Sequence, residues 1–463
     1  MKPRNRYRLA GVLGLLVFAM TASPVRSAQT IYVDFDSIKD AYDADPGGPG
    51  LPPADEIYVY STTQRETILD TLNSHFEMYG MLFLEGPRPV VFADSQVTVN
   101  KGFGAGSDGV DFRNLNHDDD AFINAISIFK FFGKTAGDWT DDDVVQATVN
   151  LVGHEASHLQ GARHHDALNP INHGLGGGIA PGDFLPGYPG PSDAGDTGIT
   201  FASQHAGGSL SFESVIEPKY VSERVIPRLI VADSGGDSFH TDETATDNHT
   251  VDMAQYVPTP AFSAPYPLRP PLAPGETVLP VGIDGFAATV AGTLDLIPES
   301  PPETPAFLSD YYAFDAMAGQ VWTIEAMSYI LELGERYADG ADVAILLLNE
   351  FGDVVPYHTG DAINDDDDDS GGVFFGASLI DVVIPVSGTY VIEVVAAAPF
   401  LGTGKDGTDG GSYELFLYSG EVLTVTIPEP GTLGLLLLSA SGLWRHRARR
   451  CRSAASASLI ARS

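Results

Sequence analysis

The chain has 463 residues, more than one hydrophobic core usually organises, so we expect two domains together with terminal signals. It carries 62 acidic and 25 basic residues, a formal net charge of −37, and eleven of the bases lie in residues 1–28 and 431–463, which hold no acid. The strongly acidic body between these ends repels nucleic acid and anionic membrane surfaces, which excludes both as its targets.

Residues 1–28 predict a secretory signal peptide. Basic residues precede an apolar run over residues 9–20, and small residues follow at Ser27 and Ala28, where we expect cleavage. The run is too short to favour a permanent membrane span. The only cysteine is Cys451, so no intramolecular disulfide can form. We therefore expect an exported protein whose added cross-links, where it has any, are metal ions.

The first folded region, residues 29–256, alternates short strand and helix patterns. Thr63 and Glu66 have capping-box spacing and predict a helix that ends at Gly80. An apolar segment over 121–129 fits either a buried helix or a buried strand. Short strands are also expected over residues 30–35, 57–60 and 89–99.

One stretch of this region has metal-ligand spacing, His154-Glu155-x-x-His158-x-x-Gly161-x-x-His164. On a helix, His154 and His158 lie one turn apart on one face, so both imidazoles reach one tetrahedral metal ion. Gly161 can adopt a left-handed conformation, end the helix and let His164 turn back as a third ligand. Glu155 can contact a water at the fourth position and act as a general base. A surface helix with solvated histidines is the alternative.

The start of this helix is predicted at Thr140. Thr140 is a good capping residue, and the aspartates at 141–143 suit the positive end of the helix dipole. Capping is the preferred role for these aspartates, with calcium binding as the alternative. The acidic run at 118–120 is interpreted as a solvated loop, again with a cation site as the alternative.

The extended motif resembles the zinc-binding signature of the metzincin metallopeptidases. The resemblance implies that His154, His158 and His164 hold Zn²⁺ and that Glu155 is the catalytic base in peptide-bond hydrolysis. It also implies a twisted mixed sheet beside the active-site helix, which favours a strand over 121–129.

Metzincins also place a methionine-containing turn beneath the metal and then a helix. No methionine lies between Met81 and Met253 in this chain. We prefer Phe201 as the apolar replacement, because a helical pattern follows it at 222–232, and Met253 is the alternative. Asp166 is expected to form hydrogen bonds near the site.

Prolines cluster over residues 257–280 and predict a semi-rigid linker. Residues 281–426 then show short strand patterns with turn signals between them, as expected for an all-β sandwich. The strands are expected over 287–296, 311–316, 321–328, 343–348, 379–385, 389–395 and 413–418. Motifs within 310–324 and 387–415 resemble the bacterial pre-peptidase C-terminal domain, which commonly accompanies secreted peptidases, and another jelly-roll-like sandwich is the alternative. The acidic loop at 364–369 is a candidate for Ca²⁺, with an unbound surface loop as the default interpretation.

Residues 427–463 resemble the PEP-CTERM sorting signal of Gram-negative bacteria. Pro428-Glu429-Pro430 is followed by an apolar run over 431–444 and a basic run over 445–450. The resemblance implies recognition by export sorting machinery, transient inner-membrane contact through a transmembrane segment, and removal of the tag. The mature protein is then expected at the cell surface or in the extracellular matrix, and a plain C-terminal anchor is the alternative.

Together these patterns predict an α+β metzincin-like catalytic domain over 29–256 followed by an all-β sandwich over 281–426. The predicted function is an exported zinc-dependent endopeptidase that acts on a protein or peptide. The alternative is a non-catalytic surface or matrix protein with a structural zinc site and a binding sandwich. Glu155 directed at an open fourth metal position favours hydrolysis, whereas a fourth protein ligand such as His165 or Asp166 favours the structural alternative.

Overall fold

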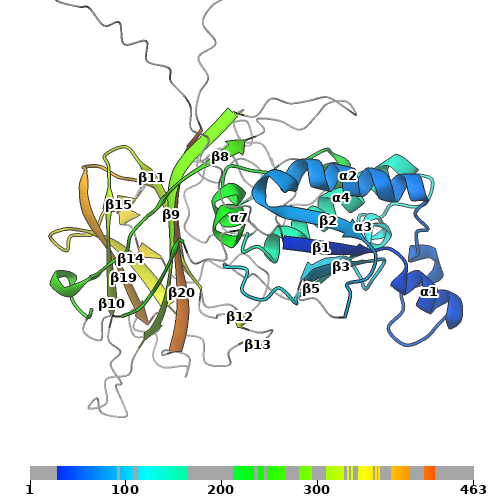
Figure 1. Ribbon diagram of the computed structural model, residues 1–463, viewed down its shortest axis with the longest axis horizontal. Coiled ribbons are helices and arrows are strands. Elements are labelled where there is room, and N and C mark those ends of the chain that lie inside the picture. The colour runs from blue at the N-terminus through cyan, green and yellow to red at the C-terminus, as the bar shows by residue number, and fades with distance from the viewer. Residues whose placement is uncertain are drawn as a thin grey trace, which may run out of the picture. The chain divides into compact units, whose positions relative to one another are not determined.

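The computed structural model describes residues 29–422 with internal gaps, the longest of which are 167–211, 267–280, 295–308, 365–376 and 397–410. The predicted signal peptide at 1–28 and the predicted sorting signal at 427–463 lie outside the described residues. What is described is a mixed α/β protein with several sheets (Figure 1).

A mixed five-stranded sheet organises the first part of the chain, with strand order β2-β1-β3-β5-β4. Neighbouring strands are parallel except at the edge, where β4 runs antiparallel to β5. Alternation buries one set of side chains, among them Ile31 and Val33 on β1 and Val97 on β3. The strands are β1 Gln29–Asp34, β2 Met81–Glu85, β3 Ser95–Val99, β4 Ala105–Ser107 and β5 Asp120–Ile123.

Helices α2 and α4 pack against this sheet and against each other (Figure 1). The predicted cap of α2 at Thr63 and Glu66 is wrong by two residues, because Ser61 and Gln64 form the capping box. The helices are α1 Ser37–Ala44, α2 Thr62–Phe76, α3 Ala125–Phe131, α4 Asp141–His158, α6 Phe212–Ile216 and α7 Val225–Asp233. Short 3₁₀ turns are η1 Ala54–Glu56, η2 Glu77–Tyr79 and η4 Val251–Met253.

Two further predictions for this part are corrected by side chains that bond to the backbone. The strand preferred over 121–129 is right only as far as Ile123, because Asn124 accepts a hydrogen bond from the backbone N–H of Ser127 and starts α3. No strand forms over 57–60. The amide of Asn100 instead satisfies both the N–H and the carbonyl of Tyr58, at 3.2 and 3.0 Å.

Two larger sheets share one apolar core and form a β-sandwich. Their strand orders are β17-β14-β19-β10-β7 and β18-β11-β20-β9-β6, and β8 also pairs with β9. Inward side chains from both sheets, including Phe314, Trp322 and Ile392, make up the core. The main strands are β9 Val281–Leu294, β10 Asp310–Ala316, β11 Val321–Met327, β14 Val343–Asn349, β18 Ala377–Val383, β19 Gly388–Ala396 and β20 Gly411–Val422. All seven predicted strands overlap these elements, which confirms the alternating pattern.

Short strands extend or flank the sandwich. These are β6 His240–Asp242, β7 Gln255–Tyr256, β8 Ala261–Tyr266, β12 Leu331–Glu332, β13 Glu335–Arg336, β15 Pro356–Tyr357, β16 Gly360–Asp361 and β17 Ile363–Asn364. β8 lies in the range predicted as linker, whose remainder from 267 is outside the described residues. The sandwich therefore includes strands that precede residue 281, and the described residues up to Glu421 group into one compact unit.

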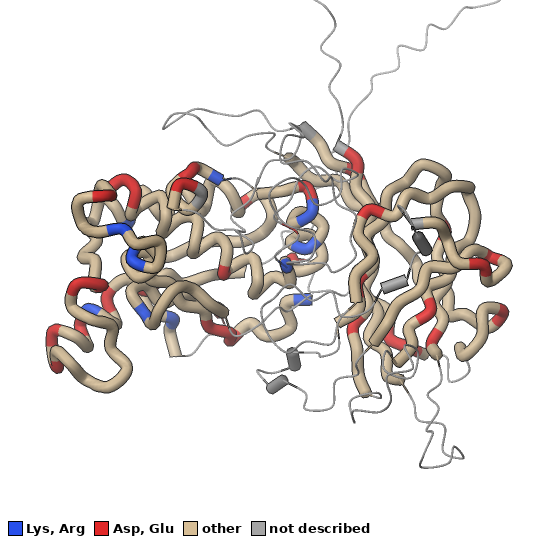
Figure 2. The backbone as a smooth tube through the Cα atoms, turned by 180° about the vertical axis from the view of Figure 1, so that it is seen from behind, with Lys and Arg blue, Asp and Glu red and all other residues tan. Residues whose placement is uncertain are grey.

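The expectation of a transmembrane segment is corrected. Among the residues that the structure describes, no helix is long and apolar enough to cross a membrane. The apolar run over 431–444, on which the expectation depended, lies outside those residues. Acidic positions are spread over both the α/β part and the sandwich (Figure 2), in keeping with the net charge of −37.

Candidate metal centre

Helix α4 positions the candidate ligands, and it starts where the sequence predicts. The hydroxyl of Thr140 accepts a hydrogen bond from the backbone N–H of Asp143, whose carboxylate accepts one from the backbone N–H of Thr140. Asp141, Asp142 and Asp143 occupy the first turn, where negative charge is favoured. The C-terminal half of the helix is buried, so its polar side chains are held in an enclosed environment.

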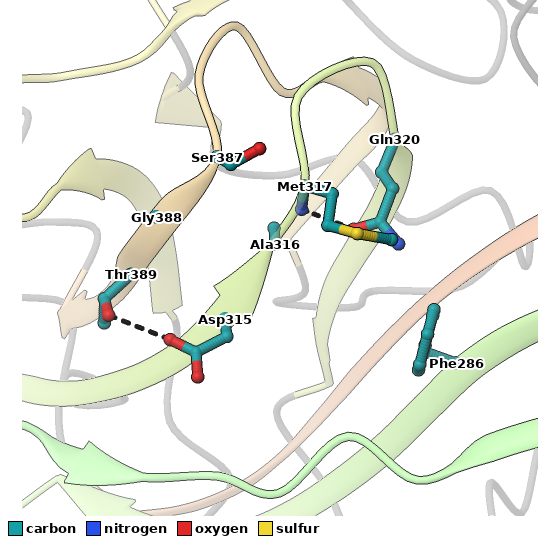
Figure 3. A pocket seen from close by; sticks show the side chains of 8 residues that line it. All are labelled: Phe286, Asp315, Ala316, Met317, Gln320, Ser387, Gly388 and Thr389. Carbon is teal, nitrogen blue, oxygen red and sulfur yellow. Dashed lines mark hydrogen bonds between the residues drawn. The ribbon is translucent and has the colours of Figure 1, made fainter.

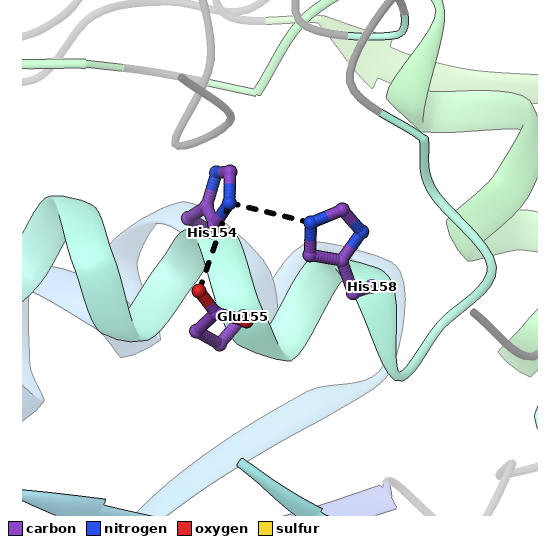
Figure 4. A group of neighbouring side chains, drawn as sticks. All are labelled: His154, Glu155 and His158. Carbon is purple, nitrogen blue, oxygen red and sulfur yellow. Dashed lines mark hydrogen bonds and ion pairs between the residues drawn. The ribbon is translucent and has the colours of Figure 1, made fainter. Parts of the chain in front are cut away.

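His154 and His158 lie on successive turns of α4 with their ε nitrogens facing each other (Figure 4). The two Nε2 atoms are 3.3 Å apart. Two nitrogen ligands about 2.0–2.1 Å from a tetrahedral zinc ion are separated by about 3.3 Å, so the separation of the pair matches that of two zinc ligands. With Glu155, these histidines are the one group of three or more potential ligands found close together within the described residues.

The ring of His158 is oriented by the turn that ends α4. Its Nδ1 lies 2.9 Å from the carbonyl of Ala162, and because a carbonyl only accepts, Nδ1 carries the proton and donates. Nε2 therefore keeps its lone pair for a metal, as ligating histidines usually do. Gly161 makes this turn possible with φ +87, and the N–H of Ala162 returns to the carbonyl of Ser157 at 2.9 Å.

Glu155 is buried beside the histidines, with Oε1 3.7 Å from Nε2 of His154 (Figure 4). Burial raises the pKa of Glu155 to about 8, and a hydrogen bond with Ser107 opposes that rise. Ser107 ends β4, the antiparallel edge strand of the five-stranded sheet. The carboxyl therefore binds a proton more tightly than an exposed glutamate does.

Of the predicted site residues, the structure brings together His154, Glu155 and His158. His164 and Phe201 lie outside the described residues. Asp166 is described, and both of its carboxylate oxygens accept hydrogen bonds, from Arg228 at 3.0 Å and from the hydroxyl of Tyr418 at 3.2 Å. Asp166 thus forms hydrogen bonds, as expected, and is not one of the potential metal ligands that lie together at His154, Glu155 and His158.

Other residues considered from the sequence have different surroundings. Met253 is half-exposed in η4, and its neighbours Val251 and Ala254 pack against sandwich residues. Tyr256 is exposed, and its hydroxyl donates to Asp315 at 3.2 Å. In the acidic run at 118–120, Asp118 and Asp120 pair with Arg88. The acidic loop beyond residue 364 lies outside the described residues.

Sequence reasoning missed Ser107 and the role of the Ala162 carbonyl. Ser107 follows a short segment rich in glycine and alanine and reaches Glu155 only because β4 pairs with β5. The Ala162 carbonyl is a backbone group and has no sequence signature of its own. The positive φ of Gly161, which the motif did predict, was the available signal for that turn.

A cavity of about 410 Å³ lies at one end of the sandwich (Figure 3). Its polar groups are largely bonded to one another: Asp315 accepts from Thr389 at 2.8 Å, and Gln320 accepts from the N–H of Met317 at 2.7 Å. This leaves little unsatisfied polarity to select a ligand, so the histidine group is the stronger candidate.

No family model matches the chain, and no curated protein matches it. Among solved structures it is similar to PliG, a periplasmic lysozyme inhibitor of g-type lysozyme from Aeromonas hydrophila, at 15% identity over 29% of this chain and 86% of that one, with TM-score 0.17. It is also similar to the pre-peptidase C-terminal domain of a collagenase from Bacillus anthracis, at 16% identity over 28% and 87%, with TM-score 0.16. Likenesses at these TM-scores do not establish a shared fold.

Proposed function

We propose that this chain is an exported zinc-dependent endopeptidase. One observation carries the proposal: two histidine Nε2 atoms stand 3.3 Å apart, at zinc-ligand spacing, with the buried carboxylate of Glu155 beside them. The metzincin resemblance of residues 154–164 supports it, as does the mixed sheet beside α4 that this resemblance implies. His164, three residues after Gly161, is the third ligand in this proposal.

The roles of the side chains follow from their surroundings. His154 and His158 bind the ion through Nε2, and the Ala162 carbonyl keeps His158 in the tautomer whose Nε2 carries a lone pair. When bound, zinc polarises a carbonyl and acidifies water. Glu155 takes the proton from the attacking water and passes it to the leaving amine, and the positive charge of a bound metal ion would lower the pKa of Glu155 towards the carboxylate form that this role needs.

The substrate class follows from charge and compartment. A body with 62 acidic residues repels polyanions, so a protein or peptide is the proposed substrate. The signal-peptide pattern at 1–28 and the sorting-signal pattern at 427–463 support action at the cell surface or in the matrix outside a Gram-negative cell. The sandwich is proposed as a companion module, with Ca²⁺ as a candidate ligand of its acidic loop.

A structural zinc site in a non-catalytic surface protein is the second candidate. Burial favours it, since His154, Glu155 and His158 are only 8%, 2% and 6% exposed, whereas a catalytic site needs a path for substrate. The identity of residue 155 argues for catalysis, because a purely structural site has no use for a carboxylate beside the ligands.

The test compares Glu155→Gln with Glu66→Gln, the same change at an exposed position of α2. Zinc content is measured by metal analysis and hydrolysis with a peptide library, with and without a chelator. We expect Glu155→Gln to keep its zinc and lose activity by at least about 100-fold, because it removes the proton carrier alone. Glu66→Gln is expected to behave as wild type. Unchanged cleavage in Glu155→Gln, or no chelator-sensitive cleavage by wild type, favours the structural alternative.

The ligands are tested separately by metal content. We expect His154→Ala and His158→Ala to lose stoichiometric zinc, because each removes one nitrogen of the facing pair. His75→Ala, which removes another buried helical histidine, is the control and is expected to retain the metal. A wild-type chain that binds no stoichiometric zinc would refute both candidate functions.

A further inference from the structure

The turn that follows α4 is fixed by two buried charged residues. Arg163 and Asp166 form two hydrogen bonds with each other. The backbone N–H of Arg163 donates to the Asp166 carboxylate at 2.8 Å, and the backbone N–H of Asp166 donates to the Arg163 carbonyl at 3.0 Å. Both side chains are fully buried. Arg163 directly follows Ala162, whose carbonyl accepts the hydrogen bond from His158.

The partners of these two residues come from the β-sandwich. Arg163 donates to Glu325 on β11 at 3.2 Å and to Ser378 on β18 at 3.3 Å. The hydroxyl of Tyr418 on β20 donates to Asp166 at 3.2 Å. β18, β11 and β20 are consecutive strands of one sheet, and Ser378 lies directly opposite Glu325. The face of a rigid sheet therefore holds both charged residues of the turn.

Arg228 on α7 closes the arrangement into a ring. It donates to Asp166 at 3.0 Å and to Glu325, and its guanidinium lies 4.1 Å from the centroid of the Phe416 ring on β20. The ring therefore runs Arg163, Glu325, Arg228, Asp166 and back to Arg163, and its two positive and two negative charges balance. Moving any one member of this set would leave an uncompensated buried charge, which is costly.

We propose that Glu325 of the sandwich is a positioning residue of the metal centre. It holds Arg163, Arg163 fixes the turn over Gly161–Arg163, and this turn presents the Ala162 carbonyl that orients the ring of His158. The sandwich therefore completes the metal site and is more than an attached binding module. This inference rests on the proposed function in one respect, that His154 and His158 hold a metal ion.

The test removes the charge of Glu325 and compares it with an equivalent change elsewhere. Asp381→Asn is the matched control, because Asp381 on β18 forms a buried pair with Arg224, just before α7, with a nitrogen–oxygen distance of 2.8 Å. Both variants remove one buried carboxylate charge that joins the sandwich to the rest of the chain. Only Glu325 bonds to Arg163 of the turn.

In the full chain, zinc affinity is measured by competition with a chelator, and the ligand geometry by the visible spectrum of the Co²⁺-substituted protein. Thermal unfolding establishes that each variant is folded. We expect Glu325→Gln to weaken zinc binding by about 10-fold or more and to alter the Co²⁺ spectrum, as loss of an outer partner of a ligand does. Asp381→Asn is expected to lower the melting temperature but to leave zinc affinity and the spectrum unchanged.

Equal zinc affinities and identical Co²⁺ spectra in the two variants would overturn the inference while leaving the proposed function in place. Absence of zinc from the wild-type chain would overturn both. If Glu325→Gln fails to fold, Ser378→Ala and Tyr418→Phe decide the matter, because each removes one hydroxyl contact to the turn and no charge. A changed Co²⁺ spectrum in either supports positioning by the sandwich, and unchanged spectra in both refute it.

Discussion

His75 is a buried histidine on α2 and is not part of the His154, Glu155 and His158 group. Burial lowers the pKa of His75 to about 4 from its ordinary value of 6.5, because the charged form loses its hydration. The unfolded chain therefore binds a proton at this residue below pH 6.5, whereas the folded chain does not until about pH 4. Stability is unaffected by this group above pH 6.5 and falls as the pH drops from 6.5 towards 4.

We expect His75→Gln to flatten this dependence. The contribution that wild type loses by pH 4 is roughly 3 kcal/mol, from about 1.4 kcal/mol for each pH unit between the two pKa values. Urea unfolding from pH 4 to 7 measures the slope, which is independent of any constant cost of the substitution. His117→Gln, at an exposed histidine, is the control. A slope identical to that of wild type would show that His75 does not set the acid sensitivity.

Single residues also mark the limit of what the motif could predict. The spacing of His154, Glu155 and His158 was sufficient to place the three side chains together, since helix geometry alone brings positions four apart onto one face. The high proton affinity of Glu155 was not predictable. It arises from burial, and the hydrogen bond with Ser107 that opposes it depends on the pairing of β4 with β5.

The turn that ends helix α4 orients a metal-ligand candidate, whereas the start of the helix lies several turns away from it. Gly161 has φ +87, a conformation that costs a non-glycine residue about 1–2 kcal/mol, and the turn it makes carries the carbonyl bonded to His158. Gly133, with φ +71, ends α3 in a similar way but lies far from the histidines in the sequence and is exposed.

We therefore expect Gly161→Ala and Gly133→Ala to destabilise the fold by a similar amount, about 1–2 kcal/mol, because each forces an alanine into the left-handed region. Only Gly161→Ala is expected to weaken zinc binding, by about 10-fold or more, because it disturbs the orientation of His158. Denaturant unfolding and chelator competition provide the two measurements. Equal zinc affinities in the two variants would show that the turn does not orient the ligand.

Elements with strong local sequence signals could be predicted. Elements whose bounds depend on a hydrogen bond between a side chain and the backbone could not. Thr140 and the acidic first turn located the start of α4, and alternation located the seven main sandwich strands. The same kind of pattern failed at 57–60, where Asn100 replaces a neighbouring strand as the hydrogen-bond partner. It failed again after Ile123, where Asn124 converts the chain from strand to helix.

For the whole molecule, composition predicted two folded parts but not how they depend on each other. Proline clustering indicated a linker over 257–280. The strands β6, β7 and β8 nevertheless precede residue 281 and belong to the sandwich sheets. Arg163, Arg228 and Glu325 are far apart in the sequence, and no local pattern identifies them as partners. Their pairing is a property of the tertiary fold alone.

This dependence can be tested by cutting the chain at the boundary that the sequence suggests. A fragment of residues 29–256 lacks β9, which pairs with β6, and lacks Glu325 and Asp381. Arg163, Arg224 and Arg228, which are buried in the whole chain, would lose these carboxylates and the sheet that covers them, and β6 would lose its neighbouring strand.

We therefore expect the 29–256 fragment to show no cooperative thermal unfolding and to be cleaved rapidly by a protease, whereas a 29–422 fragment, which keeps every described element, unfolds cooperatively. Near-ultraviolet circular dichroism during heating provides the measurement, because it reports fixed packing of aromatic side chains. A cooperative transition in the shorter fragment near that of the longer one would show that the α/β part folds independently. In that case the ring that includes Arg163 and Glu325 would be a contact between independent domains and not part of a shared core.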